Sequence, residues 1–321
     1  MKILVTGGAG FIGSNIVDKY VKLGHDVVIL DNFSTGKKGN CNSAARFYYC
    51  DIRDSMLVDG IIEFEKPDII NHHAAQISVP ESVKNSDLDF EINFIGTQNI
   101  LKAMKHYGTR KIIFASSGGA IYGEAEEYPT TEKCMPDPMS PYANHKLMAE
   151  GAIEAATLEH GINYTILRYS NIYGPRQTKN GEAGVVAIFI EKLLNRKQIT
   201  LNHFETEPLG MIRDYCYVKD VVQANVLALN GGKNEVYNIG TGVGSYTHIL
   251  FLLICESLQL NTGKDYNLLP LNSAPPREGD IKRSCLDCKK AWNELGWYPK
   301  ISLVDGIEKT VEWWIKSMTS Y

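Results

Sequence analysis

The sequence lacks the features that mark membrane and nucleic-acid-binding proteins. Its 321 residues contain no run of about 18 apolar residues, so no membrane-spanning helix is expected. Lysine and arginine number 33 against 37 aspartates and glutamates, and the resulting net charge of −4 excludes a generally basic surface. Met1-Lys2-Ile3 leads directly into an apolar strand pattern, without the pattern of a signal peptide. We therefore expect a cytoplasmic protein that binds no nucleic acid or membrane and holds any anionic ligand with a few local cations and backbone amides.

Cysteines are few and scattered. There are 7, an odd number, and only Cys285 and Cys288 form a C-x-x-C pair. A zinc site would need a second pair, or histidines at a matching spacing, and none is nearby. We expect no metal site and a structural or incidental role for this pair.

The first half of the chain alternates short apolar runs with longer amphipathic stretches. This alternation predicts a parallel sheet with helices on both faces, the doubly wound Rossmann form of the α/β class. The expected strands cover residues 3–6, 26–30, 47–50, 68–71, 111–115 and 164–167, and the expected helices 11–23, 88–106 and 142–160.

The pattern changes after Pro175. Helices are expected at 184–194 and 218–229, a strand at 235–239, an irregular polar stretch at 202–210 and a proline-rich loop at 274–279. We predict a larger domain formed by 1–170, to which 213–242 returns. A smaller, interleaved α/β domain, formed by 171–212 and 243–321, should close over the carboxyl ends of the strands.

A glycine-rich turn joins the first expected strand to the first expected helix. The motif G-x-x-G-x-x-G lets the backbone approach a pyrophosphate, which the free amides of the helix N-terminus can bind. The candidate residues are Gly7, Gly10, Phe11, Ile12 and Gly13. Asp31, at the end of the second strand, can accept hydrogen bonds from a ribose diol and would repel a 2′-phosphate, which favours NAD over NADP as the cofactor. Asp51 and Ile52 follow the third strand and are candidates for contact with the adenine.

Tyr142 and Lys146 are one helical turn apart and therefore share a face of the expected helix. A phenol is a poor base at neutral pH, and a lysine ammonium one turn away should lower its pKa. Ser116 and Ser117 end the fifth strand, where a hydroxyl could share the proton of a substrate alcohol. These four residues are the candidate catalytic groups, and Tyr142 and Lys146 are also expected to contact the cofactor.

These motifs together resemble the NAD-dependent nucleotide-sugar epimerase/dehydratase family of extended short-chain dehydrogenases, most closely its UDP-glucose 4-epimerase group. The resemblance rests on M-K-I-L-V-T-G-G-A-G-F-I-G-S and D-N-F-S-T-G and extends over nearly the whole chain. It places Asn32, Ser34, Thr35 and Gly36 beside the adenosine, and Ala74, Ala75 and Gln76 beside the nicotinamide. Counting forward from Phe114, the family's catalytic serine falls on Ser117; counting back from Tyr122, it falls on Gly119, which has no hydroxyl. His145 stands where the family commonly has serine.

The resemblance also assigns residues to a nucleotide-sugar substrate. It implies that Asn171, Arg213 and Arg277 bind the diphosphate, that Tyr215 contacts the nucleotide and that Asp280 takes the uridine ribose. Ser284 stands where a bulky tyrosine blocks N-acetyl sugars in some members, so an acetamido sugar should be accepted. Asn202–Met211 lacks the family's usual Phe-Gly-Asp-Gly run, which leaves the nucleobase less firmly assigned.

The expected reaction is 4-epimerisation of a UDP-hexose through a transient 4-keto intermediate, with UDP-glucose and UDP-galactose, or their N-acetyl counterparts, as substrates. Gly118 and Gly119 replace the acids of 4,6-dehydratases and UDP-glucuronate decarboxylases. UDP-glucuronate 4-epimerase stays open, with Arg176 or Lys179 as the carboxylate ligand. A non-catalytic NAD(H) sensor is the third alternative, but such proteins usually lose the tyrosine or the lysine. Helices 88–106 and 142–160 should pair two chains into a homodimer.

Overall fold

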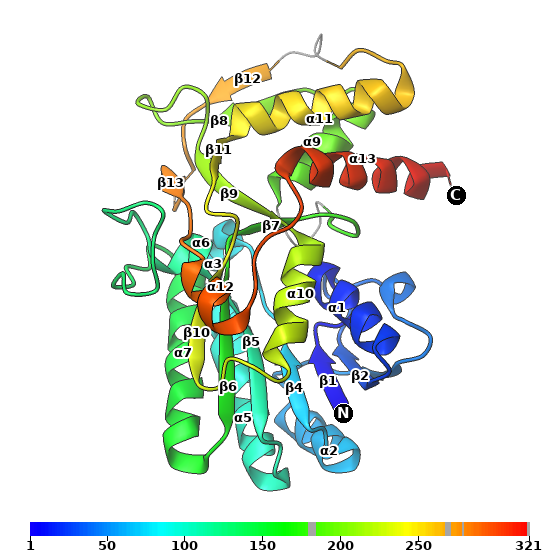
Figure 1. Cartoon of the computed structure of the whole chain (residues 1–321), viewed down its shortest axis with the longest axis vertical. Coiled ribbons are helices and arrows are strands. Elements are labelled where there is room, and N and C mark those ends of the chain that lie inside the picture. The colour runs from blue at the N-terminus through cyan, green and yellow to red at the C-terminus, as the bar shows by residue number, and fades with distance from the viewer. Residues whose placement is uncertain (179–183, 267–270, 278, 320–321) are drawn as a thin grey trace.

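A parallel sheet forms the centre of the larger part of the molecule (Figure 1). The computed structural model describes residues 1–178, 184–266, 271–277 and 279–319. In these residues the sheet has seven strands in the order β3-β2-β1-β4-β5-β6-β10, all parallel. They are β1 (Lys2–Thr6), β2 (Asp26–Asp31), β3 (Arg46–Tyr49), β4 (Ile69–His72), β5 (Lys111–Ser117), β6 (Asn163–Tyr169) and β10 (Glu235–Ile239). The predicted α/β class with a doubly wound parallel sheet is confirmed.

Both faces of this sheet are buried, which explains why its strands are continuously apolar. Ile3 and Val5 of β1 point into one core cluster, whereas Leu4 between them points into the other. The first cluster is closed by α1 (Phe11–Lys22) and α10 (Val218–Ala228). The second is closed by α2 (Ser55–Glu65), α5 (Gly96–Tyr107) and α7 (Pro141–His160).

The helix predicted over 88–106 is interrupted by a π-helical turn. The helical run consists of α4 (Ser86–Phe90), the π turn η2 (Glu91–Ile95) and α5. Asn85 caps its start by accepting a hydrogen bond from the backbone N–H of Leu88 at 3.2 Å. The short helix α3 (Val79–Lys84), just before it, was not predicted from the sequence.

The smaller part has its own apolar core, formed by α9 (Val185–Leu194), α11 (Thr247–Thr262) and α13 (Leu303–Thr319). These helices lie together at the top of Figure 1, apart from the helices that cover the central sheet. The short strands are β7 (Asn171–Tyr173), β8 (Ile199–Asn202), β9 (Ile212–Tyr217), β11 (Gly244–Tyr246), β12 (Leu271–Ala274) and β13 (Arg283–Ser284). The remaining short elements are η1 (Lys38–Asn40), α6 (Gly118–Ile121) and α12 (Lys289–Leu295).

The chain crosses between the two parts more than once. β9 pairs with β7, β11 and β13, whereas α10 and β10, which follow it, pack on and extend the central sheet. The boundaries at 171, 213 and 243 remain a prediction. In the described part of the chain, no helix combines the length and apolarity that a membrane crossing requires.

The strand order reverses between β1 and β4, and connections leave the carboxyl ends of these two strands in opposite directions. Ligands of open α/β sheets bind at such a point. A cavity of about 920 Å³ lies there and extends from the glycine-rich turn to β8 and β9 of the smaller part.

Candidate active site

The glycine turn at one end of the cavity fits a dinucleotide pyrophosphate. Gly7 has φ +66°, and a Cβ at this residue would lie 2.7 Å from the backbone N of Ala74. A Cβ at Gly13 would lie 2.2 Å from the carbonyl oxygen of Gly7, so α1 packs directly on the turn. The N-cap residue of α1, Gly10, has no capping side chain, and Phe11, Ile12 and Gly13 line the cavity with it. The first amides of the helix are therefore available to an anion.

The expected ribose carboxylate is in place at the end of β2. Asp31 is 6% exposed and lines the cavity; it accepts hydrogen bonds from the backbone N–H of Ala9 at 3.0 Å and of Phe33 at 2.8 Å. Burial raises its pKa, whereas these two hydrogen bonds stabilise the anion. Each carboxylate oxygen keeps a second lone pair, as binding of a ribose diol requires.

The other residues predicted to contact the adenosine divide into two groups. Asn32, Ser34, Thr35, Asp51 and Ile52 line the cavity, whereas Gly36 is not among its lining residues in the described structure. A Cβ at Gly36 would lie 2.8 Å from Asp31 Oδ1, so this glycine packs directly against the carboxylate of Asp31. Asp51 is paired with Arg53, whose hydrogen bonds lower the pKa of the carboxyl to about 2. Ala74, Ala75 and Gln76 line the cavity after β4.

The structure distinguishes the two serines at the end of β5. The Ser116 hydroxyl donates to the buried carboxylate of Glu150, which also pairs with Arg168 Nη2 at 2.6 Å. Ser117 instead lies close enough to Tyr142 for its side chain to lower the pKa of the phenol. Both serines touch the cavity, but only Ser117 meets the candidate base. Ser117 therefore fits the catalytic position, whereas Ser116 belongs to a buried ion-pair network.

Tyr142 and Lys146 enter the cavity from the first turns of α7. The helix begins with Pro141, and the Ser140 hydroxyl caps it by accepting from Ala143 N at 3.2 Å. Lys146 is 4% exposed, and its Nζ lies 4.1 Å from the centroid of the Phe114 ring.

The lowered phenol pKa expected from the sequence is not supplied by the protein's own groups. Burial raises the pKa of Tyr142 to about 12, although the hydrogen bond from Ser117 opposes this effect. Burial also lowers the pKa of Lys146 to about 7, so near neutral pH this lysine carries a full charge only part of the time. A buried site of this kind needs a further positive charge before the phenol can ionise. The oxidised nicotinamide ring carries such a charge.

At the other end of the cavity, Arg213 on β9 is a half-buried cation. Its guanidinium donates to the backbone carbonyls of Ile212 at 3.0 Å, Ile281 at 2.8 Å and Lys282 at 3.3 Å. Among the described residues, no carboxylate forms an ion pair with it, and burial lowers its pKa. A half-buried charge on the wall of a cavity, with no ion-pair partner in the described part of the chain, indicates an anionic ligand.

The remaining substrate candidates line the same cavity as Arg213, with one exception. Asn171, Tyr215, Arg277 and Asp280 line the cavity. Arg277 and Asp280 are joined by a hydrogen bond, since Asp280 Oδ2 accepts from Arg277 N at 2.8 Å. Asn171 Oδ1 is buried and has no hydrogen-bond partner in the described structure. Ser284 on β13 is buried, but it is not among the described residues that line the cavity.

Arg176, considered for a glucuronate carboxyl, is engaged elsewhere. Its Nη2 lies 2.7 Å from Asp18 Oδ2 on α1, and in the described structure Arg176 does not line the cavity. Lys179, the other candidate, lies outside the described residues.

Several lining residues were not predicted. They are supplied by α9, β8, the end of β4 and the start of α11: Phe189, Lys192, Thr200, Asn202, His73 and Thr247. No motif marks them, because their place depends on how the smaller part packs over the sheet. In the described residues, no group of three or more His, Cys, Asp or Glu side chains could hold a metal.

Comparison with known proteins identifies the family. The model of the NAD dependent epimerase/dehydratase family matches residues 3–240, and the chain belongs to this family. The UDP-glucose 4-epimerase of Mycolicibacterium smegmatis is 40% identical over 318 residues, which cover 97% of this chain and 98% of that protein.

Two solved structures show the same fold along the whole chain. The crystal structure of UDP-glucose 4-epimerase with UDP-glucose from Thermotoga maritima is 46% identical, with a TM-score of 0.93, and the match covers 99% of this chain and 100% of that one. The UDP-glucose 4-epimerase of Thermus thermophilus, in complex with NAD, is 42% identical, with a TM-score of 0.92, and the match covers 98% of this chain and 99% of that one. The predicted family and NAD as the cofactor are confirmed.

Proposed function

We propose that this chain is an NAD-dependent UDP-hexose 4-epimerase. The observation that carries the proposal is one cavity with Ser117, Tyr142 and Lys146 on its wall, the glycine turn at one end and the Arg213 cation at the other. The first end suits a dinucleotide and the second a sugar diphosphate, so the hexose would lie beside the tyrosine. The relatives named as UDP-glucose 4-epimerases support uridine as the base and glucose as the sugar.

In this proposal the chain's residues bind, orient and move one proton. NAD⁺, when bound, accepts and returns a hydride at carbon 4 and adds a positive charge beside the phenol. Tyr142 accepts the proton of the 4-hydroxyl, and Ser117 shares it by hydrogen bond. Arg213 and Arg277 hold the diphosphate while the 4-keto hexose turns over. Tyr142 then returns the proton to the new 4-hydroxyl.

The two parts of the chain would divide this work. Residues 1–170, with the part of 213–242 that returns to the sheet, would hold NAD, and 171–212 with 243–321 would hold the sugar nucleotide. The glycine turn on the first and the Arg213 and Arg277 cations on the second support this division. Acceptance of UDP-N-acetylglucosamine rests only on the small size of Ser284, which lies beside Gly119 but is not among the described residues that line the cavity.

The direct test incubates purified protein, without added NAD, with UDP-glucose, UDP-N-acetylglucosamine and UDP-glucuronate in separate tubes, and identifies the products by NMR. A 4-epimer of UDP-glucose is the expected product, and turnover of the N-acetyl sugar would support the Ser284 prediction. The proposal is wrong if NAD remains bound and none of the three sugars is epimerised, with or without added NAD⁺.

The enzyme would act as a cytoplasmic homodimer. Its seven cysteines are all free thiols, which suits a reducing compartment. Met148 and Leu158 on α7 and Ile95 next to α5 are exposed apolar side chains on the two helices expected to pair. Sedimentation velocity, which separates monomer from dimer, tests this assembly.

A further inference from the structure

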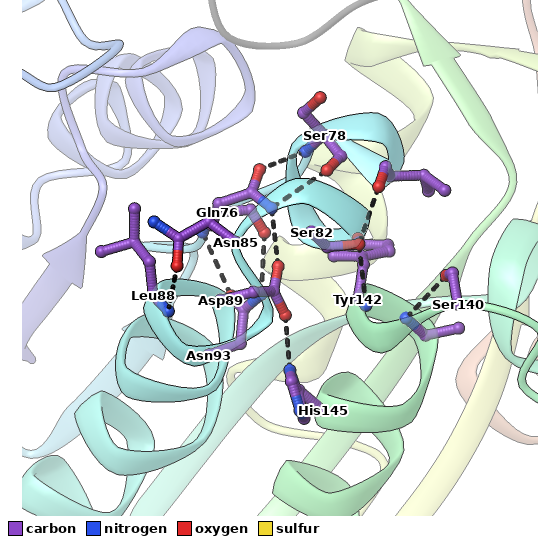
Figure 2. Close-up of polar contacts among 12 residues, drawn as sticks. Gln76, Ser78, Ser82, Asn85, Leu88, Asp89, Asn93, Ser140, Tyr142 and His145 are labelled. Atoms are coloured by element: carbon purple, nitrogen blue, oxygen red, sulfur yellow. Dashed lines mark hydrogen bonds and ion pairs between the residues drawn. The ribbon is translucent and has the colours of Figure 1, made fainter. Parts of the chain in front are cut away.

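The Gln76 side chain is held by the protein at each of its polar atoms (Figure 2). Its Nε2 donates to Asp89 Oδ1 at 2.6 Å and to the carbonyl of Ser78 at 3.0 Å, and its Oε1 accepts from Ser78 N. Both amide hydrogens are therefore used within the protein. Gln76 touches the cavity, but its amide N–H groups hold a loop rather than a ligand.

The backbone of Gln76 is fixed as well, by Asn93 in the π turn. Gln76 N donates to Asn93 Oδ1 at 3.1 Å, and Asn93 Nδ2 donates to the Gln76 carbonyl at 2.9 Å. The Asn93 side-chain amide thus makes two hydrogen bonds with the backbone of Gln76, one to its N–H and one to its carbonyl. Asp89 and Asn93 are four residues apart in this helical run, so their side chains share one face and both reach the same loop.

Asp89 connects this loop to the catalytic helix. The residue is fully buried, and its Oδ2 lies 2.7 Å from His145 Nδ1 on α7. His145 stands between Tyr142 and Lys146 in sequence and is 8% exposed, with its ring packed against Phe90 at 5.3 Å. Figure 2 shows the continuous path from Ser78 through Gln76 and Asp89 to His145.

We propose that Asp89 and His145 are positioning residues that lock the loop 74–78 to α7. The cofactor-facing wall formed by Ala74, Ala75 and Gln76 would then keep a fixed distance from Tyr142 and Lys146. Neither Asp89 nor His145 is among the described residues that line the cavity, so both act through other residues. The inference concerns NAD placement and, for its effect on catalysis, rests on the proposed function.

The charge on Asp89 adds to this role. Burial lowers the pKa of Lys146, and the negative charges of Glu150 and Asp89 oppose that shift. The same charge on Asp89 raises the pKa of Tyr142, after burial and against the Ser117 hydrogen bond. The buried carboxylate therefore favours the charged lysine and also holds the loop.

The test compares His145→Leu, His145→Asn and Gln76→Glu with the wild type. Leucine removes the donor to Asp89, whereas the asparagine amide can place an N–H where Nδ1 was. Glutamate at position 76 keeps the size of the side chain but brings a carboxylate against Asp89. NAD and UDP dissociation constants are measured by calorimetry on cofactor-stripped protein, and kcat and KM with UDP-glucose on the loaded enzyme.

We expect the NAD dissociation constant of His145→Leu and Gln76→Glu to rise about tenfold, as for one lost net hydrogen bond. kcat should fall on the order of 100-fold through misplacement of the reacting groups, with KM and UDP affinity unchanged. His145→Asn should restore the NAD dissociation constant and kcat to within a few-fold of the wild-type values. If His145→Leu does not fold, the other two variants decide the question.

His106→Leu is the matched control, because it breaks a surface His–Asp pair with Asp59 at 3.6 Å and should change nothing. The proposal is overturned if His145→Leu and Gln76→Glu bind NAD like the wild type. It is also overturned if His145→Asn is as impaired as His145→Leu, or if UDP affinity falls in parallel with NAD affinity. A wild type that binds NAD but epimerises nothing would refute the proposed function. The NAD dissociation constants of the variants would still show whether Asp89 and His145 hold the loop 74–78 against α7.

Discussion

Replacing each serine at the end of β5 by alanine should give opposite results, although the two residues are neighbours. The Ser117 side chain acts on the pKa of the Tyr142 phenol, whereas the Ser116 hydroxyl donates to Glu150. Ser117→Ala should therefore affect the reaction and leave folding intact. Ser116→Ala should affect folding and leave the reaction intact.

The expected loss for Ser117→Ala follows from its place beside the base. A positioned group that shares a proton in the transition state contributes about 10²–10⁴-fold, so kcat should fall at least on the order of 100-fold. Ser117 occupies the N-cap position of α6, but its side chain makes no capping hydrogen bond there. We therefore expect the free energy of unfolding to change by less than about 0.5 kcal/mol.

The expected loss for Ser116→Ala is one hydrogen bond to a buried carboxylate. Glu150 would keep Arg168, whose Nε lies 3.1 Å from Oε1 and whose Nη2 lies 2.6 Å from Oε2. A hydrogen bond to a charged group contributes about 1.5–3 kcal/mol, and the free energy of unfolding should fall by that amount. The Glu150 charge stays paired, so kcat should remain close to that of the wild type.

Urea unfolding followed by circular dichroism gives the stability of each variant, and NMR of UDP-glucose conversion gives kcat. The reasoning is refuted if Ser116→Ala loses activity at wild-type stability while Ser117→Ala remains active. Such a result would mean that the catalytic hydroxyl is the one bonded to Glu150.

Three further predictions concern other parts of the molecule. Arg213→Met removes the half-buried cation that has no ion-pair partner among the described residues, and should weaken UDP binding on the order of 100-fold, measured by calorimetry; unchanged affinity would mean that the diphosphate lies elsewhere. Burial lowers the pKa of Lys146 to about 7 in the folded protein, against 10.5 for a free side chain. Between these two pH values the unfolded chain binds more protons than the folded one, so the free energy of unfolding should rise with pH. Lys146→Met should flatten this rise in urea titrations at several pH values, and an equally steep rise in the variant would contradict the low pKa. Met148→Glu places a charge on the exposed face of α7 and should shift sedimentation from dimer to monomer, whereas a dimer that persists would exclude this helix face.

The features recovered from the sequence are those with local causes. Apolar runs buried on both sides, the glycine turn between β1 and α1, and Asp31 at the end of β2 each leave a pattern within a few residues. The fold class and most of the cofactor end of the cavity follow from such patterns. Tyr142 and Lys146 could be predicted for the same reason, because one helical turn sets their relation.

What the sequence missed depends on contacts between distant segments. β8 pairs with β12 some seventy residues later, for example Ile199 with Leu271, and no local pattern marks either short strand. The roles of Ser116 and Ser117 cannot be told apart until Glu150 is seen beside one of them. The lowered phenol pKa was predicted from Lys146 together with the positive charge of the nicotinamide; the protein's own burial of Tyr142 acts in the opposite direction and raises this pKa.

The central claim is that hydride leaves carbon 4 and returns to it without leaving the enzyme. The most direct measurement uses UDP-glucose deuterated at carbon 4, incubated with the purified enzyme in ordinary water and analysed by NMR. The account predicts UDP-galactose that retains deuterium at carbon 4, and no conversion by Tyr142→Phe. Loss of the deuterium to solvent would show that the stereocentre is inverted by proton exchange, and would contradict the account.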